Sequence, residues 1–441
     1  MATLDSGSCD PSFAGSKHAS HFHGDDRKPT HSPWCPMTRL LFVAVLLASA
    51  TTPLLAQDAH IERVRRILAE VPLVDGHNDL PGAVREASTS GLEGAVAGYD
   101  LRSTTTGDTD LYRLRQGMVG AQFWSVHVNV EATNPAREQL EQIDIAHRII
   151  ERYPDHLELA TSASEIMQAF GRGKIASLLG IEGGHVIENS LGALRAYYVL
   201  GVRYMTLAHF TNTDWADSAT DEPVNDGLSA FGEDVVREMN RLGMLVDISH
   251  VSPATMNDVL DVAEAPVIFS HSGARAVTDH VRNVPDGVLA RLPENGGLVM
   301  QVFYPPYVSE DYRLYDERSQ QAAQVDIQRR FGNDAARIEQ ELERWRQANP
   351  APAATISDVA DHIEHIRDVA GIDHVGLGSD FDGIPTYVDG LEDVSTFPAL
   401  LVELSRRGWS DEDLRKVAGE NLLRVMRNAE AVASRLQRAE R

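Results

Sequence analysis

From about Ile61 onward, short apolar runs alternate along the chain with segments of helical periodicity. This alternation is typical of a parallel sheet whose strands are connected by helices. Because the runs form one series without an internal repeat, we predict a single α/β domain over residues 57–441, a (β/α)8 (TIM) barrel. The eight strands are predicted near Leu73–His77, Ala121–His127, Ile175–Glu182, Tyr204–His209, Met244–His250, Val267–His271, Gly297–Phe303 and His374–Asp380.

Capping residues predict where several helices begin. Ser252 before Pro253 is an N-cap followed by proline at the first helical position. Ser410 with Asp413 has the spacing of a capping box. Ser357 precedes another apolar-periodic run, and we expect a helix to begin there.

One connection is longer than a minimal barrel needs. Residues Ser309–Thr355, between the seventh and eighth predicted strands, are highly charged and show helical periodicity around Ile338–Trp345. Connections of this length are commonly lids, binding elements or oligomer contacts. Because this charged helical insertion follows the carboxyl end of a strand, we expect it to cover the site as a lid.

The segment Met37–Ala56 has one arginine, an apolar run from Leu40 to Ala48, and small residues afterwards. This order is typical of a secretory signal peptide, and the run is too short for a membrane span. We expect Met37 to be the initiator and residues 1–36 to be a non-native or disordered extension. The mature protein is then expected to be secreted or periplasmic, without a stable membrane anchor, since its C-terminal end carries no lipid-anchor signal.

Charge and cysteine content narrow the function classes. The formal net charge of −25 argues against nucleic acid as a partner, because a phosphate backbone requires a basic surface. The chain has only two cysteines, Cys9 and Cys35, and both precede the expected mature start. Disulfides and thiolate metal sites are therefore not expected, and any metal must be held by histidines and carboxylates.

Metal-type side chains follow the ends of four predicted strands. His77 and Asp79 are two apart, so in extended backbone both side chains point to the same side. Glu182 ends a run that a parallel sheet buries on both faces, where a carboxylate is costly unless it is paired or metal-bound. His250 and His271 end neighbouring strands. A barrel assembles its active site from such strand ends, so we predict a two-metal centre, although each residue alone has a purely structural interpretation.

Further polar residues end other predicted strands. His209 and Asp380 suit acid–base or electrophilic roles, because the other five side chains suffice for two ions. Asp380 is preferred over Asp382 because it directly follows the apolar run. His127 ends the second predicted strand and could reach the site, but no residue pairs with it. His362 and His365 lack the His-Glu-x-x-His order and are expected on a solvated or packing face.

With these motifs in view, the chain resembles the membrane (renal) dipeptidase family of zinc peptidases, within the amidohydrolase-type barrels. The resemblance runs from about Ile61 to Met426 and rests on VDGHNDLP, AQFWSV, GIEGGH, LAHFTNTDWADS, DISH, FSHSGAR, RNVPD, DHVGLGSDFDG and GENLLRV. It differs from animal members in lacking their disulfide cysteines and lipid-anchor tail.

The resemblance implies a binuclear zinc dipeptidase. His77 and Asp79 would hold one zinc ion, His250 and His271 the other, and Glu182 would bridge both. His209 would lie at the substrate carbonyl oxygen, Arg282 at its carboxylate, and Asp380 would transfer protons. The implied reaction is hydrolysis of short free-ended dipeptides by a hydroxide shared between the two ions. A homodimer is implied by the resemblance only.

Two other interpretations remain open from the sequence. Another amidohydrolase-type amidase would usually begin with His-x-His and use a carboxylated lysine. Here the first pair is His77 and Asp79, and Lys174 lies at the start of the third predicted strand. An inactive binding protein on the same barrel is the third interpretation. It is disfavoured because every predicted ligand is a competent type.

Overall fold

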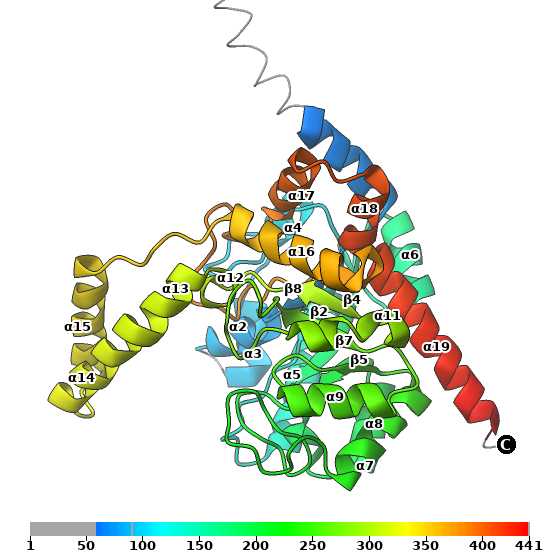
Figure 1. Cartoon of the computed structure of the whole chain (residues 1–441), viewed down its shortest axis with the longest axis horizontal. Coiled ribbons are helices and arrows are strands. Elements are labelled where there is room, and N and C mark those ends of the chain that lie inside the picture. Colours follow the sequence, from blue (N-terminus) through cyan, green and yellow to red (C-terminus); the bar gives the residue numbers. More distant parts are fainter. Residues whose placement is uncertain (1–58, 90, 440–441) are drawn as a thin grey trace, which may run out of the picture. The chain divides into compact units, whose positions relative to one another are not determined.

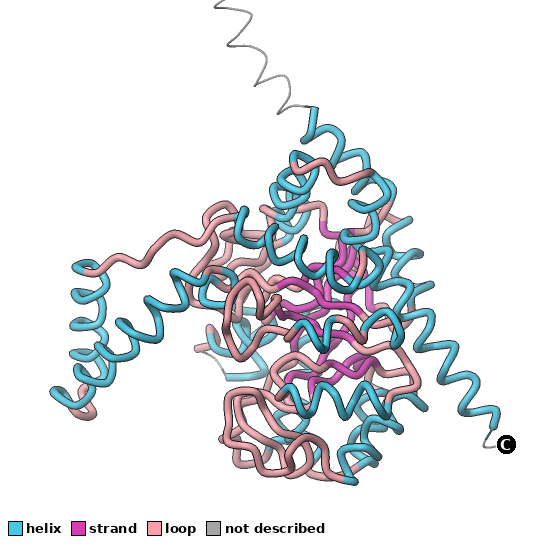
Figure 2. The backbone as a smooth tube through the Cα atoms, viewed as in Figure 1, coloured by secondary structure: helices cyan, strands magenta, loops and turns pink. Residues whose placement is uncertain are grey.

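The apolar runs of the sequence fold as parallel strands. The computed structural model describes residues 59–89 and 91–439, so the predicted N-terminal extension and signal peptide lie outside the described residues. Eight strands close a barrel, and helices lie around it (Figures 1 and 2). The sheet has nine strands, of which β3 lies outside the barrel. In chain order they are β1 (Leu73–Asn78), β2 (Val119–Ser125), β3 (Leu157–Leu159), β4 (Ile175–Glu182), β5 (Val202–Thr206), β6 (Leu245–Asp247), β7 (Ile268–Ser272), β8 (Leu298–Gln301) and β9 (Val375–Leu377).

The order of the strands confirms the predicted barrel. Neighbouring strands run β2-β1-β9-β8-β7-β6-β5-β4, and pairing of β2 with β4 closes the ring. The short strand β3 was not predicted. It lies outside the ring and adds in parallel to the beginning of β4, with Leu157 opposite Ile175.

Alternate strand residues pack in two different layers. On β8, Leu298 and Met300 pack in the interior cluster, whereas Val299 between them packs in the layer shared with the helices. On β4, Ala176 and Leu178 belong to the interior cluster, and the same alternation brings Glu182 inward at the end of the strand. Burial on both faces explains why the strands appear in the sequence as continuous apolar runs.

In addition to backbone hydrogen bonds, one buried side chain reinforces the seam between the first and last strands. β1 and β9 share a single register pair, Asp75 opposite Leu377. The buried carboxylate of Asp75 accepts hydrogen bonds from the backbone N–H and the hydroxyl of Ser379, both at 2.7 Å. It also accepts one from the Gln122 amide on β2, at 2.8 Å. Burial nevertheless raises the pKa of Asp75 to about 6.

Helices follow most strands and cover the outside of the barrel (Figure 2). A helix over residues 59–70 precedes β1. The others are α2 (Leu80–Glu86), α3 (Gly91–Gly98), α4 (Leu111–Gln116), α5 (Pro135–Arg152), α6 (Ala163–Gly171), α7 (Leu191–Val199), α8 (Ala230–Leu242), α9 (Pro253–Val262), α10 (Asp286–Leu289), α11 (Leu292–Asn295), α12 (Pro305–Val308), α13 (Glu310–Tyr315), α14 (Gln321–Phe331), α15 (Ala335–Ala348), α16 (Ile356–Ala370), α17 (Phe397–Arg406), α18 (Asp411–Arg415) and α19 (Asn421–Ala439). Within residues 59–439, none of the helices combines the length and apolar content needed to cross a bilayer.

Two of the three predicted helix starts are confirmed. Ser252 caps α9 by accepting from the Thr255 N–H, and Ser410 forms the predicted capping box with Asp413 at α18. The prediction that a helix begins at Ser357 is wrong by two residues. Thr355 is the N-cap of α16, because its capping box with Asp358 satisfies the first free N–H groups.

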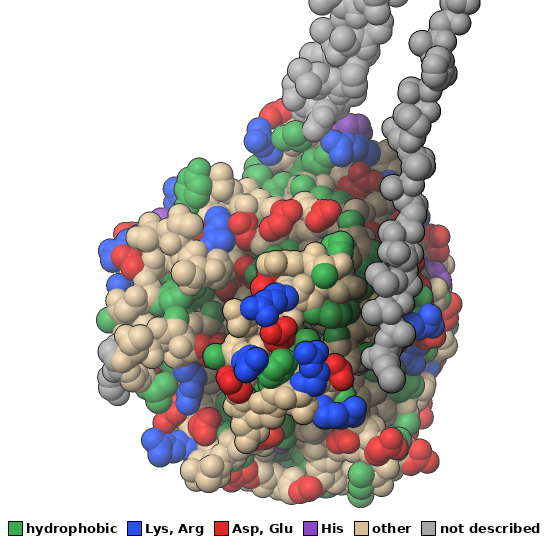
Figure 3. Space-filling model, turned by 90° about the vertical axis from the view of Figure 1, so that its left-hand side faces the viewer, with side chains coloured by type: hydrophobic (Ala, Val, Ile, Leu, Met, Phe, Trp, Pro, Cys, Tyr) green, Lys and Arg blue, Asp and Glu red, His purple; other side chains and the backbone are tan. Residues whose placement is uncertain are grey.

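The long charged connection between β8 and β9 is helical, as expected. It contains α13, a π-helical turn (Asp316–Gln320), α14 and α15. Helices α14 and α15 pack on each other and lie away from the strands (Figure 1). Seen from that side, acidic and basic side chains are interspersed (Figure 3).

Candidate active site

The carboxyl ends of the barrel strands surround a cavity of about 310 Å³. Seven of the eight predicted site residues line it, and the eighth, His77, is fully buried directly behind it. They lie at the carboxyl ends of strands or in the loops that follow, with His77 and Asp79 at β1 and both His271 and Arg282 at β7. The lining residues predicted from the sequence are Asp79, Glu182, His209, His250, His271, Arg282 and Asp380.

Four imidazole rings converge on one carboxylate oxygen. Glu182 Oε1 lies 3.1 Å from His250 Nε2 and 3.3 Å from His271 Nε2. The same oxygen lies 3.5 Å from His77 Nε2 and 3.6 Å from His209 Nε2. His250 Nε2 and His271 Nε2 are only 2.8 Å apart, so their ring nitrogens point at nearly one place.

His77 and Asp79, at the end of β1, face Asp380, which follows β9. His77 Nε2 lies 3.4 Å from Asp79 Oδ2 and 4.0 Å from Asp380 Oδ1. A Cβ at Gly383 would lie 2.3 Å from Asp79 Oδ2 and 2.9 Å from Asp380 Oδ1. Glycine at this position therefore lets the chain pass the two carboxylates without a clash.

A buried tyrosine holds His77. The Tyr204 hydroxyl on β5 lies 2.8 Å from His77 Nδ1, which leaves Nε2 directed at the carboxylates. The tyrosine ring lies across Gly180 of β4, where a Cβ would come within 2.0 Å of the ring. The glycine thus makes room for the ring that orients His77.

A chain of hydrogen bonds orients the ring of His271. Its Nδ1 lies 2.8 Å from the Ser270 hydroxyl, which donates at 2.6 Å to Asp247 Oδ2. Asp247 also accepts from the Thr206 hydroxyl and from the Ser249 and Ser270 N–H groups. Hydrogen bonds to the rear nitrogen of a histidine fix its tautomer and ring direction.

The charge states of the site residues differ strongly. Burial alone would raise the pKa of Glu182, but His209 and His77 outweigh burial and hold that pKa well below its usual range. Burial raises the pKa of Asp380 well above its usual value; His77 opposes this effect, and Asp79 and Glu182 add to it. Burial lowers the pKa of His209 to about 4 and the pKa values of His250 and His271 well below normal. Burial would also lower the pKa of His77, but Tyr204 and Glu182 outweigh burial and hold that pKa well above its usual value.

Two of the predicted residues have uncommon backbone conformations. His250 has φ = 67° and Asp380 has φ = 70°, in the left-handed region that favours glycine. Strained residues of this kind persist where the surrounding structure over-determines them, typically at functional sites. In this backbone conformation the side chains of His250 and Asp380 both line the cavity.

Arg282 is a buried cation without an anionic partner. Its side chain is 1% exposed and donates only weakly, to the His271 carbonyl at 3.3 Å and the Ser272 hydroxyl at 3.5 Å. Its Nε has no hydrogen-bond partner, and among the described residues no carboxylate pairs with it. The guanidinium lies over the Tyr307 ring, 5.4 Å from its centroid. A buried guanidinium facing a cavity in this way is suited to an anionic ligand.

Comparison with known proteins decides the family. The family model for membrane dipeptidases, peptidase family M19, matches residues 61–440. The chain belongs to this family. It is also 40% identical over 393 residues to Dipeptidase verJ of Clonostachys rogersoniana, covering 86% of this chain and 90% of that protein. The chain is thus a dipeptidase of a metallopeptidase family, as the motifs predicted.

Solved structures show that this dipeptidase shares the family fold. The probable dipeptidase PvdM from Pseudomonas aeruginosa is 23% identical with a TM-score of 0.70, covering 85% of this chain and 100% of that one. A Rhodobacter sphaeroides metallopeptidase, bound to a phosphinate mimic of the dipeptide L-Ala-D-Ala, is 24% identical with a TM-score of 0.66. That match covers 81% of this chain and 99% of the other.

The structure also brings unpredicted residues into the dipeptidase cavity. Phe210 and Tyr307 line it, and Phe210 packs its ring on those of His209 and His250, at 4.1 and 5.1 Å. Neither could be singled out, because an aromatic residue beside a strand end is usually a core residue. His127, which showed no partner in the sequence, lies with its ring 4.8 Å from that of His209.

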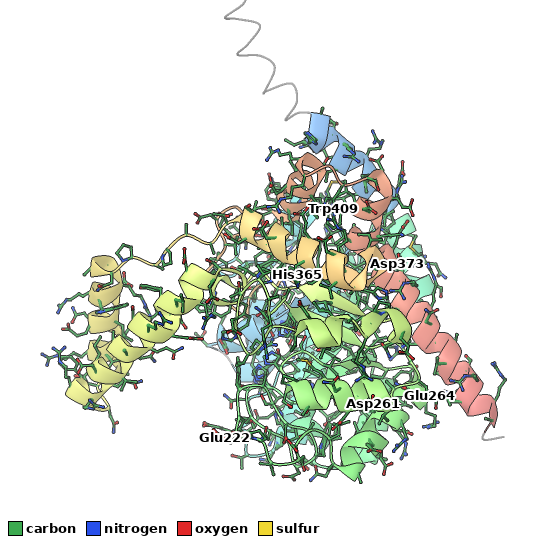
Figure 4. The ribbon with its side chains drawn as sticks, in the orientation of Figure 1. Glu222, Asp261, Glu264, His365, Asp373 and Trp409 are labelled. Carbon is green, nitrogen blue, oxygen red and sulfur yellow. The ribbon has the colours of Figure 1, made fainter. Side chains whose placement is uncertain are left out.

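The histidines and the lysine that the sequence analysis excluded from the site lie elsewhere in the dipeptidase. His362 is buried in packing, where its Nδ1 accepts from the Ala274 N–H and its Nε2 donates to the Val308 carbonyl. His365 lies on α16 and pairs with Asp286 at 2.8 Å (Figure 4). Lys174 pairs with Glu158 at the beginning of β4, opposite to the end that carries Glu182.

The charged insertion does not line the cavity in this structure. Within the described chain, the lining residue nearest to it in sequence is Tyr307 of α12, just before the insertion begins. The lid role predicted for Ser309–Thr355 therefore remains a prediction.

Proposed function

We propose that this dipeptidase cleaves dipeptides with free termini and uses two divalent cations, with zinc as the expected metal. His77 and Asp79 would hold one ion, His250 and His271 the other, and Glu182 would lie between them. The observation that carries this proposal is the convergence of imidazole nitrogens on Glu182 Oε1.

The donor set fits such ions. His77 Nε2 is buried and has no hydrogen-bond partner, which is costly unless something else occupies its lone pair. Its rear nitrogen is held by Tyr204, and that of His271 by Ser270, so both front nitrogens are free to ligate. Nitrogen and carboxylate donors without thiolates suit zinc, cobalt or manganese.

Bound at these side chains, divalent ions would polarise the substrate carbonyl and lower the pKa of a water molecule toward neutrality. The remaining chemistry falls to the protein. His209 faces the same carboxylate oxygen from the cavity wall, where its ring can donate to the substrate carbonyl oxygen. Asp380 lies 4.0 Å from His77 Nε2 and can accept a proton and return it to the leaving amine.

Arg282 and the small volume of the cavity would limit the size of the substrate. Arg282 offers its planar fork to the terminal carboxylate, with the Tyr307 ring beneath it. The volume of about 310 Å³ is at the small end for ligand pockets, which suits a dipeptide better than a longer chain. A dipeptide mimic bound to the Rhodobacter sphaeroides relative supports the same substrate class.

The proposal is tested by measuring metal content and peptidase activity on one preparation that begins near Gln57. We expect about two ions per chain, and chelator-sensitive release of amino acids from an L-L or L-D dipeptide. A dipeptide amide, which lacks the terminal carboxylate, should be cleaved poorly. Two bound ions without cleavage of any dipeptide would redirect the search to other amides, and absence of tight metal would overturn the proposal.

A further inference from the structure

A second group of metal-type side chains lies in the wall of the cavity. His127, in the loop after β2, and His209, after β5, have ring centroids 4.8 Å apart and ring planes inclined by 60°. His127, Glu182 and His209 each offer a ligand atom, and these atoms lie within 4.8 Å of one another. Both histidines line the cavity, and an ion that enters the cavity can reach them.

The side chain of His127 forms no hydrogen bond with the described residues. Its Nε2 is buried and lacks a hydrogen-bond partner, as does Nε2 of the neighbouring His185. The proposed reaction uses neither nitrogen. A histidine that serves only packing normally satisfies its buried ring nitrogens, so His127 is available as a ligand.

We propose that His127 and His209, with Glu182 at the edge, form an additional and weaker site for a divalent transition metal, and that filling it inhibits the enzyme. Imidazole pairs with a shared carboxylate suit zinc, cobalt and nickel. The site shares only Glu182 with the five-residue set. Because that carboxylate already serves the tighter ions, the two imidazoles must supply most of the binding, which makes the site weaker.

Inhibition follows from the position of His209. A cation on its ring nitrogen removes the donor that the substrate carbonyl oxygen needs. It also occupies space in a cavity of only about 310 Å³. Excess metal should therefore raise the KM for dipeptides, because the cation and the substrate compete for the same wall.

The test compares the wild type with His127→Phe, which keeps an aromatic ring in the wall but removes the ligand nitrogen. His365→Phe is the matched control, since His365 lies on α16 and pairs with Asp286. Each protein, already loaded with its tight ions, is dialysed against increasing Zn²⁺, and bound zinc is counted. Dipeptide hydrolysis is measured on the same samples, and Co²⁺ absorption gives a second readout of an added nitrogen-ligated ion.

We expect the wild type and His365→Phe to bind one further ion and to lose activity at least tenfold at excess zinc. His127→Phe should lack this ion and, relative to its own activity without added zinc, tolerate at least tenfold more zinc. If His127→Phe does not fold, as judged by circular dichroism, His127→Asn replaces it.

An extra ion and equal inhibition in His127→Phe would overturn the proposal, as would absence of an extra ion in the wild type. Loss of the tight ions in the wild type would instead refute the proposed two-metal function. Counting ions separates the two failures, because it does not depend on catalysis.

Discussion

Removing the Tyr204 hydroxyl should weaken metal binding more than it weakens the fold. In Tyr204→Phe, His77 Nδ1 loses its partner at 2.8 Å and stays buried. A lost partner of a ligand histidine typically lowers metal affinity by about 10–100-fold, or roughly 1.4–2.7 kcal/mol. The unfolding free energy of the metal-free protein should fall by about 1–2 kcal/mol, the usual effect of leaving one buried polar group unsatisfied.

Tyr197→Phe provides the matched control for this experiment. Its hydroxyl is also buried and donates to the Val186 carbonyl at 2.9 Å, but it does not touch the cavity residues. Zinc affinity is measured by competition with a chromophoric chelator, and stability by urea unfolding of the metal-free proteins. We expect similar losses of stability in both variants and weaker zinc binding only in Tyr204→Phe. Unchanged zinc affinity in Tyr204→Phe would refute the role assigned to this hydroxyl.

Three further predictions concern the substrate, the proton and the buried histidine. Arg282→Ala should lower kcat/KM for free dipeptides by roughly a hundredfold or more, mainly through KM, because a buried charge-assisted contact is lost. Dipeptide amides should be much less affected, and equal losses for both substrates would contradict the assignment. Asp380→Asn should keep its metal and lose roughly 10²–10⁴-fold in kcat, whereas full activity would exclude it as the proton-transfer residue. Burial lowers the pKa of His362 to about 3, and the nearby His365 lowers it further. The unfolded chain therefore binds more protons below pH 6.5, and stability falls as pH drops from 6.5 toward 3. Between pH 7 and 4.5 this residue should account for about 2–3 kcal/mol of the loss, measured by urea unfolding at both pH values. His362→Gln should lack this part of the pH dependence, and an unchanged slope would contradict the explanation.

The barrel could be predicted because its strands are buried on both faces. Continuous apolar runs such as Ile175–Glu182 stand out from amphipathic helices, and all eight predicted strands exist. Strand β3 escaped prediction because three residues, only one of them buried, carry too little pattern. The start of α16 was misplaced because Thr355 and Ser357 are both good caps, and only the contact with Asp358 distinguishes them.

Seven of the eight candidate site residues could be brought together from the sequence because each lies at or just after the end of a strand, and parallel strands bring their carboxyl ends together. Arg282, in the loop after β7, was expected only from the family resemblance. The residues that orient these side chains could not be predicted. Tyr204 lies inside an apolar strand and looks like any core tyrosine. The relay from Asp247 through Ser270 depends on register between β6 and β7, which the sequence does not reveal. That His127 could reach the site was evident from the sequence, but its contact with His209 depends on the loops after β2 and β5 and was not.

The contact between β1 and the end of β9, where Asp75 binds Ser379, has a consequence for folding during synthesis. Asp75 and Ser379 are 304 positions apart, so the first strand leaves the ribosome long before its closing neighbour exists. Until β9 emerges, β1 has one unpaired edge, and His77 and Asp79 lack Asp380 beside them. A prematurely terminated chain that lacks β9 therefore cannot bring the predicted site residues together.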